Sequence, residues 1–306
     1  MLIYSLRRLA NLLPTLLIVS FIVFAMVRLI PGDPVTAIAG PDSTPELMAQ
    51  IRESLGLNEP LLAQYGVYLR GLVTGDLGTS IRSRQPVWSE IGRRLPATLE
   101  LAGAAMLLSL VVGVGLGVLA ALRPGGTVDA LARFVSLFGV SSPTFWTGLL
   151  FILAFAYYWR LFPISGRGGL EHLVLPAATV SLTSVAFISR LTRASLLEVL
   201  SQDYVRTARA KGTAGSRVVL KHALRNALMS PITVAGLEFG RLLSGVIVIE
   251  IIFSWPGTGR LLVNAIQFRD FPVIQGLVLV YALIFALVNL AVDLVYAALD
   301  PRIALR

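Results

Sequence analysis

Between two apolar segments, the chain has the sequence Asp203-Tyr204-Val205-Arg206-Thr207-Ala208-Arg209-Ala210-Lys211-Gly212 and, further on, His222-Ala223-Leu224-Arg225-Asn226-Ala227-Leu228. Both stretches belong to a basic loop, residues 190–227, which contains only two acids, Glu198 and Asp203. Its eight cations are Arg190, Arg193, Arg206, Arg209, Lys211, Arg217, Lys221 and Arg225. A membrane protein keeps such a loop on the cytoplasmic side. We therefore expect a cytoplasmic partner to dock there.

Composition independently predicts a membrane protein. Of 306 residues, 56% are hydrophobic and only 14% are charged, whereas soluble domains have about 25% charged residues. The mean hydropathy is +0.78. We attribute the net charge of +9 to membrane topology and not to nucleic-acid binding, because the cations cluster beside apolar segments. The absence of cysteine from the sequence excludes disulfides, thiolate metal sites and cysteine nucleophiles.

Six segments are apolar and long enough to cross a bilayer as helices, which takes about 20 residues. The sequence thus predicts an all-α membrane protein with six transmembrane helices, at 9–30, 97–122, 134–159, 173–189, 228–253 and 273–299. Residues 1–8 and 300–306 are the terminal segments. The first span resembles a signal peptide with a cleavage sequence at 37–39, but its apolar run exceeds the usual length of about 7–15 residues. We expect this helix to be retained.

Small and hydroxyl-bearing residues indicate where helices pack closely. The fourth span is short and begins near Pro176, and its hydroxyls belong to Thr179, Ser181, Thr183 and Ser184. Such hydroxyls often join membrane helices, so packing is the expected role and lining of a substrate path is the alternative. In the second span, close helix approach is predicted by the small-residue face Gly113, Gly115 and Gly117.

Charge asymmetry predicts the orientation of the chain. Six spans place both termini on one side, and that side receives fourteen arginines and lysines against ten on the other. Both termini are therefore expected in the cytoplasm. Residues 31–96 then form a small ordered outer subdomain, with an amphipathic helix at 45–56 capped by Thr44 and a second helical piece at 61–72.

The basic loop resembles that of a known family, the inner-membrane permeases of peptide, glutathione and nickel ABC importers. The resemblance continues in order through the motifs at 31–34, 75–78, 94–100, 253–257 and 300–303. It implies a type I ABC importer permease fold, with the core at 97–299. It also implies a permease subunit that translocates dipeptides, oligopeptides or glutathione, with a nickel chelate as an alternative solute.

The resemblance further implies that the loop forms the coupling helix that inserts into an ATPase subunit. The candidate ATPase-coupling residues are Arg206, Thr207, Ala208, Arg209, Ala210, Lys211 and Gly212. Small side chains allow close insertion into a groove, arginines reach carboxylates, and Gly212 permits a tight corner. The broader importer pattern has Glu-Ala-Ala in place of residues 206–208, a difference common to the peptide-type branch. Binding of anionic lipid is the alternative role of the loop.

The partners implied by the family are a second homologous permease subunit, two ATP-binding subunits and an extracytoplasmic solute-binding protein, besides membrane lipid. Neither Lys211 nor Lys221 follows a glycine, as a phosphate-binding loop requires. ATP and magnesium are therefore expected on the partner ATPases, and no catalytic, cofactor or metal site in this chain. His172 and His222 do not form a zinc-protease pair, and no nucleophile elbow indicates a hydrolase. A secondary transporter is the other alternative, although its inverted repeats and carboxylate relays are missing from the sequence.

Two charges lie within the fifth span. Glu238 and Arg241, at positions i and i+3, can pair on one helix face, and intramembrane ions are costly enough to suggest function. They are either a neutralised structural pair or candidate pathway-lining residues that meet the charged ends of a solute. Asn289 and Asp293 suggest an interhelical polar contact. Residues 250 and 255–257 resemble the outer re-entrant loop of the family, with an interfacial aromatic anchor at Trp255 as the alternative.

Overall fold

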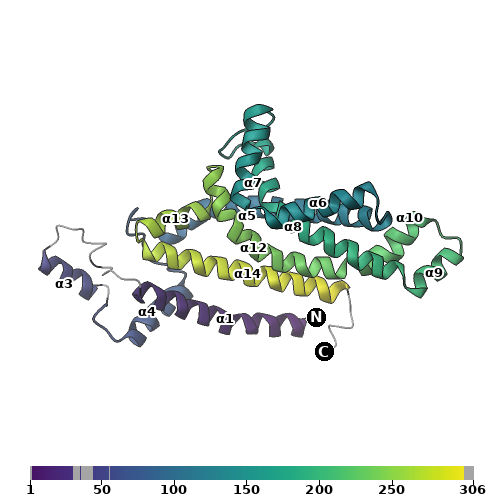
Figure 1. Ribbon diagram of the computed structural model, residues 1–306. Coiled ribbons are helices and arrows are strands. Elements are labelled where there is room, and N and C mark those ends of the chain that lie inside the picture. The colour runs from purple at the N-terminus through teal and green to yellow at the C-terminus, as the bar shows by residue number, and fades with distance from the viewer. Residues whose placement is uncertain (1, 30–34, 36–43, 55, 300–306) are drawn as a thin grey trace. The chain divides into compact units, whose positions relative to one another are not determined.

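The computed structural model describes residues 2–29, 35, 44–54 and 56–299. Within these residues the fold is helical apart from loops and a single antiparallel bridge between Thr79 and Pro86 (Figure 1). The all-α fold class predicted from the sequence is confirmed. The motifs at 31–34 and 300–303 and the cleavage-like sequence at 37–39 lie outside the described residues.

The chain divides into two compact units. The first contains Ala97–Pro256 and the segment from Leu287 onward, and the second contains Leu2–Pro96 and Gly257–Ala286. Two helices contribute to both units, α5 (Val87–Leu122) and α14 (Phe271–Leu299). The basic loop and the Glu238–Arg241 pair thus belong to the first unit.

Helix α8 (Leu170–Leu200) is the central element of the first unit. It packs chiefly against α6 (Thr127–Ser141), α7 (Thr144–Phe151) and α12 (Met229–Ile252). The unit also contains η1 (Ile152–Tyr158), α9 (Asp203–Ala210), α10 (Gly215–Arg217), η2 (Val218–Ala223) and α11 (Leu224–Ala227). Because α8 begins before the expected span 173–189 and extends beyond it, one continuous helix joins the core of this unit to the basic loop.

The hydroxyls of α8 are packing groups. Thr179, Ser181 and Ser184 are at most 2% exposed. Thr183 Oγ1 donates to the carbonyl oxygen of Gly139 in α6 at 2.9 Å. Hydroxyls buried at contacts between helices need such partners, since unpaired polar groups are costly there. These contacts fit the packing role expected from the sequence, and Thr183 and Ser184 also line a cavity beside α12.

The expected third span, 134–159, is not one helix. Helix α6 ends at Ser141, and α7 with the following π-helical turn runs from Thr144 to Tyr158, inclined by 115° to α6. Pro143 causes the break, because it lacks an N–H and forces the preceding residue out of the helical region. Ser142 accordingly has φ −88° and ψ 129°.

Several described helices have the length and composition of membrane spans. Three qualify alone: Val87–Leu122, Leu170–Leu200 and Phe271–Val292. Two bent pairs, Thr127–Ser141 with Thr144–Tyr158 and Met229–Leu243 with Val246–Ile252, each qualify as one span. The apolar segment Leu13–Met26 of α1 (Leu2–Leu29) is shorter. By length and composition, the described helices therefore supply three spans, or five if each bent pair is one span, and the apolar part of α1 is the remaining segment of the six expected.

Ahead of α5, the second unit contains the helices α3 (Pro45–Ser54) and α4 (Leu61–Thr74). Helix α13 (Thr258–Gln267) belongs to the same unit. Thr44 Oγ1 caps α3 by accepting the N–H of Leu47 at 3.3 Å, as expected. Helix α4 packs on α1 through Tyr65, whose hydroxyl lies 2.8 Å from Ser20 Oγ. The core consists of Val87, Ile91, Ala265, Val273, Leu277 and Val280.

Two of the three glycines in the second expected span lie against α8. A Cβ at Gly117 would lie 2.6 Å from Ser189 O and Thr192 Cβ, and one at Gly113 would lie 2.9 Å from Ile188 Cγ2. A Cβ at Gly115 would meet no atom within 4 Å. The Gly-x3-Gly spacing therefore permits close helix approach, as predicted, but Gly115 does not take part in it.

This difference gives a matched pair of variants. Gly117→Ala should destabilise the protein because the new methyl group overlaps α8 backbone and side-chain atoms. Gly115→Ala gains helix propensity, worth up to about 1 kcal/mol in water, without a clash. Thermal unfolding in detergent should thus show a lower midpoint for Gly117→Ala and an equal or higher one for Gly115→Ala. Equal shifts in both variants would contradict the close approach at Gly117.

Candidate functional site

The first candidate site is the surface of α9, which the basic loop presents beyond the end of α8 (Figure 1). Asp203 lies in the first turn of α9, where a negative charge is favoured by the helix dipole. Val205 is fully buried and anchors α9 to the rest of the unit. The Asn226 side-chain amide donates to Tyr204 Oη at 2.9 Å, which fixes α9 to α11.

Most of the predicted coupling residues are exposed. Of residues 206–212, only Ala208 is half-buried, and the remaining six are open to solvent. The side chain of Arg206 makes a loose ion pair with Asp203 at 3.6 Å. Such an exposed pair contributes little to stability. These arginines are thus available for a partner, while Ala208 turns partly toward the protein.

Gly212 forms the corner at the end of α9. Its φ is +75°, in the left-handed region that favours glycine. Its N–H donates to Arg209 O at 2.9 Å, and the N–H of Thr213 donates to Ala208 O at 3.3 Å. The corner expected at Gly212 is present, and the next glycine, Gly215, has no positive φ and begins α10. Between α8 and α9 the chain leaves the helical conformation at Ser201 and Gln202.

An apolar hollow adjoins this corner. It has a volume of about 630 Å³ and is lined by Val118, Leu122, Arg209, Gly215, Ser216, Val219 and Leu220. Helix α5 supplies one wall and the loop supplies the other. Behind it, Leu196 of α8 packs with Ala121, Ala223 and Ala227 in a buried cluster. The hollow beside the corner therefore rests on a packed cluster.

An ion pair with a buried carboxylate fixes the end of α8 that leads into the basic loop. This pair was not predicted from the sequence. Asp129 is 1% exposed and accepts two hydrogen bonds from Arg193, at 2.7 Å and 3.1 Å. It also accepts the N–H of Gly125 at 2.9 Å. The available signal was that Asp129 is the single acid between Arg123 and Arg133. Its donors satisfy a buried carboxylate that would otherwise be costly.

The second candidate site is the Glu238–Arg241 pair on α12. Arg241 donates to Glu238 Oε1 at 2.8 Å, and Ser184 Oγ of α8 donates to Oε2 at 3.3 Å. The Glu238 side chain is 4% exposed and that of Arg241 is 70% exposed. The guanidinium also lies 5.7 Å from the centre of the Phe187 ring. The carboxylate is therefore held inside the unit while its cation remains open.

A cavity of about 200 Å³ adjoins this pair and is lined by Thr144, Val180, Thr183, Ser184, Glu238, Arg241 and Leu242. It combines apolar walls with hydroxyls, one carboxylate and one guanidinium. Such a cavity can hold a small polar group against the cation. Of the other polar pair noted in the sequence, Asp293 lies outside the residues whose side chains are described.

The motifs at 94–100 and 253–257 meet in the first unit. Trp255 Nε1 donates to the carbonyl oxygen of Ala97 at 2.8 Å, and Thr98 Oγ1 donates to Glu250 Oε1 at 2.6 Å. Trp255 is 0% exposed. The alternative of an interfacial aromatic anchor at Trp255 is therefore wrong. A buried indole needs a hydrogen-bond acceptor, and Ala97 provides it.

No cluster of three or more His, Asp or Glu side chains suited to a metal ion occurs among the described residues. The exposed cations of α9 suit carboxylates of a protein partner. The Glu238–Arg241 cavity suits a small anion or zwitterion. Among the described residues, neither site brings together a nucleophile and a base.

Two family models match the chain. The model described as "Binding-protein-dependent transport system inner membrane component" matches residues 113–305. An N-terminal model of the same transport systems matches residues 1–102. Together they span both compact units.

Curated relatives resemble the chain along almost its whole length. The dipeptide transport system permease protein DppB of Escherichia coli K12 is 44% identical over 335 residues, covering 99% of each chain. DppB of Alkalihalophilus pseudofirmus is 42% identical, also with 99% coverage of each chain. The glutathione transport system permease protein GsiC of Escherichia coli K12 is 44% identical over 303 residues, again covering 99% of both.

Solved structures share the fold at lower identity. An inward-facing structure of the MetNI methionine ABC transporter has a TM-score of 0.56 at 20% identity, covering 69% of this chain and 96% of that one. An amino acid ABC transporter has a TM-score of 0.52 at 14% identity, covering 67% and 92%. The type I importer permease fold predicted from the sequence is thereby confirmed.

Proposed function

Since the chain belongs to the family of binding-protein-dependent transport system inner membrane components, we propose that it translocates small peptides or peptide-like solutes by alternating access. It is a non-catalytic permease subunit of the inner membrane that crosses the bilayer several times. The observation that carries the proposed solute class is the 42–44% identity over 99% of the chain to dipeptide and glutathione permeases.

The proposed complex contains this chain, a second homologous permease, two ATP-binding subunits and an extracytoplasmic solute-binding protein. ATP and magnesium bind to the ATPases, and this chain has no cofactor of its own. The exposed arginines and small residues of α9 support docking on an ATPase. Closure of the ATPases pushes the basic loop, and α8 passes that displacement to α6 and α12. This connection is the chain's contribution to alternating access.

A reconstitution experiment tests the proposal. The complex is placed in proteoliposomes with ATP inside and is supplied with a labelled dipeptide or glutathione and the binding protein outside. We expect uptake that needs both ATP and the binding protein. Uptake by this chain alone, driven by an ion gradient, would instead identify a secondary transporter.

We place both termini in the cytoplasm on the basis of the charge asymmetry. Ser216, in the basic loop, and Ser89, at the start of α5, are both exposed. The chain has no cysteine, so a single cysteine at either position gives an unambiguous label. In intact cells, an impermeant maleimide should label Ser89→Cys but not Ser216→Cys. Equal labelling of both would refute the proposed topology.

Coupling is proposed to depend on the corner at Gly212. A side chain there would meet no atom within 4 Å, so the cost of Gly212→Val comes from the left-handed backbone, about 1–2 kcal/mol. If this strain destabilises the coupled conformation, the rate of ATP-driven uptake drops about five- to thirtyfold. The ATPases and the membrane insertion of the chain remain intact.

Gly215→Val is the matched control, because Gly215 also has open space around it but lacks a positive φ. Its uptake should stay near that of the wild type. Normal uptake by Gly212→Val, or an equal loss in both variants, would show that the corner is not part of the coupling path.

The Glu238–Arg241 pair is proposed to line the solute path, with Glu238 as the buried anchor of Arg241. The support is that the Arg241 side chain is 70% exposed and lines the cavity, whereas Arg193, in the pair that fixes the end of α8, is 30% exposed. An arginine facing lipid is costly, so the open guanidinium of Arg241 needs a polar surrounding. A cavity that admits the carboxylate end of a peptide supplies one.

The double variant Glu238→Gln, Arg241→Leu tests this role without leaving an unpaired charge. It should assemble normally but lose uptake of a peptide with a free carboxylate by at least about tenfold, the effect of one lost charged hydrogen bond. Uptake of the amidated peptide should fall much less. Arg190→Leu is the control, since Arg190 stacks at 5.1 Å on the same Phe187 ring. Normal uptake by the double variant would leave the pair a structural role only.

A further inference from the structure

A short loop of the second unit, residues 78–87, is closed on itself. The N–H of Val87 donates to Gly78 O at 3.0 Å, and that of Ser80 donates to Gln85 O at 2.9 Å. Within the loop, Arg84 has a φ of +57°, a conformation that is uncommon for a residue with a side chain. Such strained residues persist where the surrounding structure over-determines them, often at functional sites.

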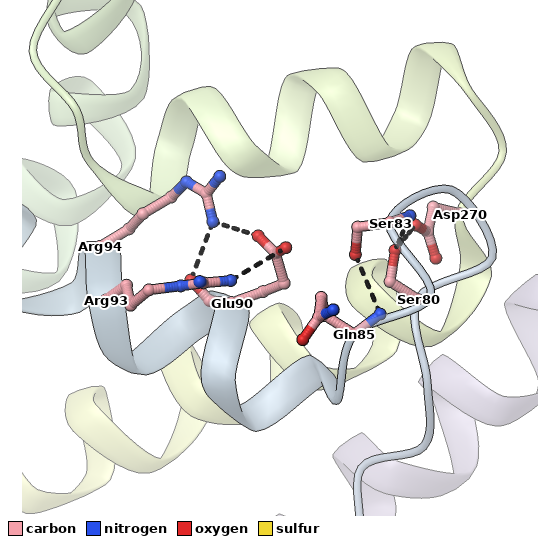
Figure 2. A network of polar contacts seen from close by, with 7 residues as sticks. All are labelled: Ser80, Ser83, Gln85, Glu90, Arg93, Arg94 and Asp270. Carbon is pink, nitrogen blue, oxygen red and sulfur yellow. Dashed lines mark hydrogen bonds and ion pairs between the residues drawn. The ribbon is translucent and has the colours of Figure 1, made fainter.

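Asp270 fixes this loop from the corner between α13 and α14 (Figure 2). Its carboxylate accepts the hydroxyl of Ser80 and the N–H groups of Ile81 and Arg82, the latter two at 3.1 Å and 3.3 Å. Asp270 is 3% exposed. These three donors occupy the carboxylate oxygens of Asp270. Asp270 therefore fixes the backbone of Arg82 and forms no ion pair with the Arg82 guanidinium.

The two segments that meet here, residues 78–96 and 257–271, carry six arginines and only two acids. Both acids, Glu90 and Asp270, are buried. Glu90 is engaged by Arg94 and by Arg93, the latter at 3.2 Å (Figure 2). In the described part of the chain, no carboxylate lies within ion-pair distance of Arg82, Arg84 or Arg269. These three exposed residues form the surface that we name the basic rim.

Arg82 is held in a defined position at the edge of a cavity. Its guanidinium carbon lies 3.7 Å from the centre of the Phe268 ring, a cation–π contact. The cavity has a volume of about 390 Å³, and its charged lining residues are Arg82 and Arg94 together with Glu90 and Asp270, whose carboxylates are already engaged by Arg93, Arg94 and the loop. It is large enough for a carboxylate side chain, and a preorganised guanidinium binds a carboxylate through two parallel hydrogen bonds with little loss of conformational freedom.

We propose that the basic rim docks an acidic surface of the extracytoplasmic solute-binding protein, with one aspartate or glutamate side chain pairing with the exposed Arg82 guanidinium at the edge of the cavity. This inference rests on the proposed function, which puts the second unit's loops on the outer side. A protein surface fits better than a free solute, because Arg84 and Arg269 lie outside the cavity lining and extend the positive field beyond it. Complementary charge of this kind mainly accelerates association.

The test measures binding of the solute-binding protein that stimulates ATP hydrolysis by the complex. The full complex is held in nanodiscs of neutral lipid, and association is followed at low and at high ionic strength. Arg82→Glu should weaken binding by at least about tenfold, mostly through a slower association rate, and should reduce the salt dependence. Arg82→Gln should give an intermediate effect. Basal ATPase activity should not change in either variant.

Arg70→Glu is the matched control, because it introduces the same charge change on an exposed position of α4 outside the two segments. It should alter binding by less than about twofold, as expected for a charge distant from the contact. Equal losses in Arg70→Glu and Arg82→Glu would overturn the proposal, as would normal binding by Arg82→Glu. If Arg82→Glu does not assemble, Arg84→Glu tests the same rim.

Two further arms distinguish other anions from the proposed partner. If anionic lipid in the nanodiscs abolishes the difference between wild type and Arg82→Glu, the rim binds phosphate head groups and the proposal fails. If a free peptide carboxylate competes with the binding protein at the rim, the cavity is a solute site and the proposal also fails. A wild-type complex that assembles with its ATPases but binds no such protein would refute the docking while leaving the permease function intact.

Discussion

The first unit depends on one constraint: α8 must bury its hydroxyl-bearing face against α6, α7 and α12 at the same time. Gly113 and Gly117 let α5 approach the same helix closely. Polar contacts then fix its orientation, through Thr183 in the middle and Arg193 near the basic loop. Because α8 continues to Leu200 without interruption, a displacement of the loop acts directly on the packed core.

Buried carboxylates organise both units, and each holds a cation or a backbone segment in place. Asp129 fixes Arg193, and Glu238 positions Arg241. Asp270 holds the loop that carries Arg82. In each case the carboxylate is satisfied inside the protein. Two of these cations, Arg82 and Arg241, remain exposed, and the proposed contacts with solute and binding protein use them.

The sequence predicted features that depend on local chemistry or composition. These include the helical membrane fold, the corner at Gly212 and the packing role of the α8 hydroxyls. It did not predict the 115° bend at Pro143, because a proline in an apolar run either kinks a membrane helix or ends it. The burial of Trp255 and the pairing of Asp129 with Arg193 depend on tertiary contacts. The sequence marks Asp129 as an isolated acid between Arg123 and Arg133, but it does not show that the partner is Arg193 or that Trp255 is buried.

The central claim is that the basic loop and the core of the first unit move as one body. Spin labels at Ser141, at the end of α6, and Ser216, in α10, both exposed, test it directly in the cysteine-free chain. Pulsed electron resonance gives the distance between the labels in the resting complex and in the complex trapped with ATP and vanadate. If the loop and the core move as one body, the distance distribution keeps its maximum in both states. A shifted maximum would show instead that the loop moves independently of α8.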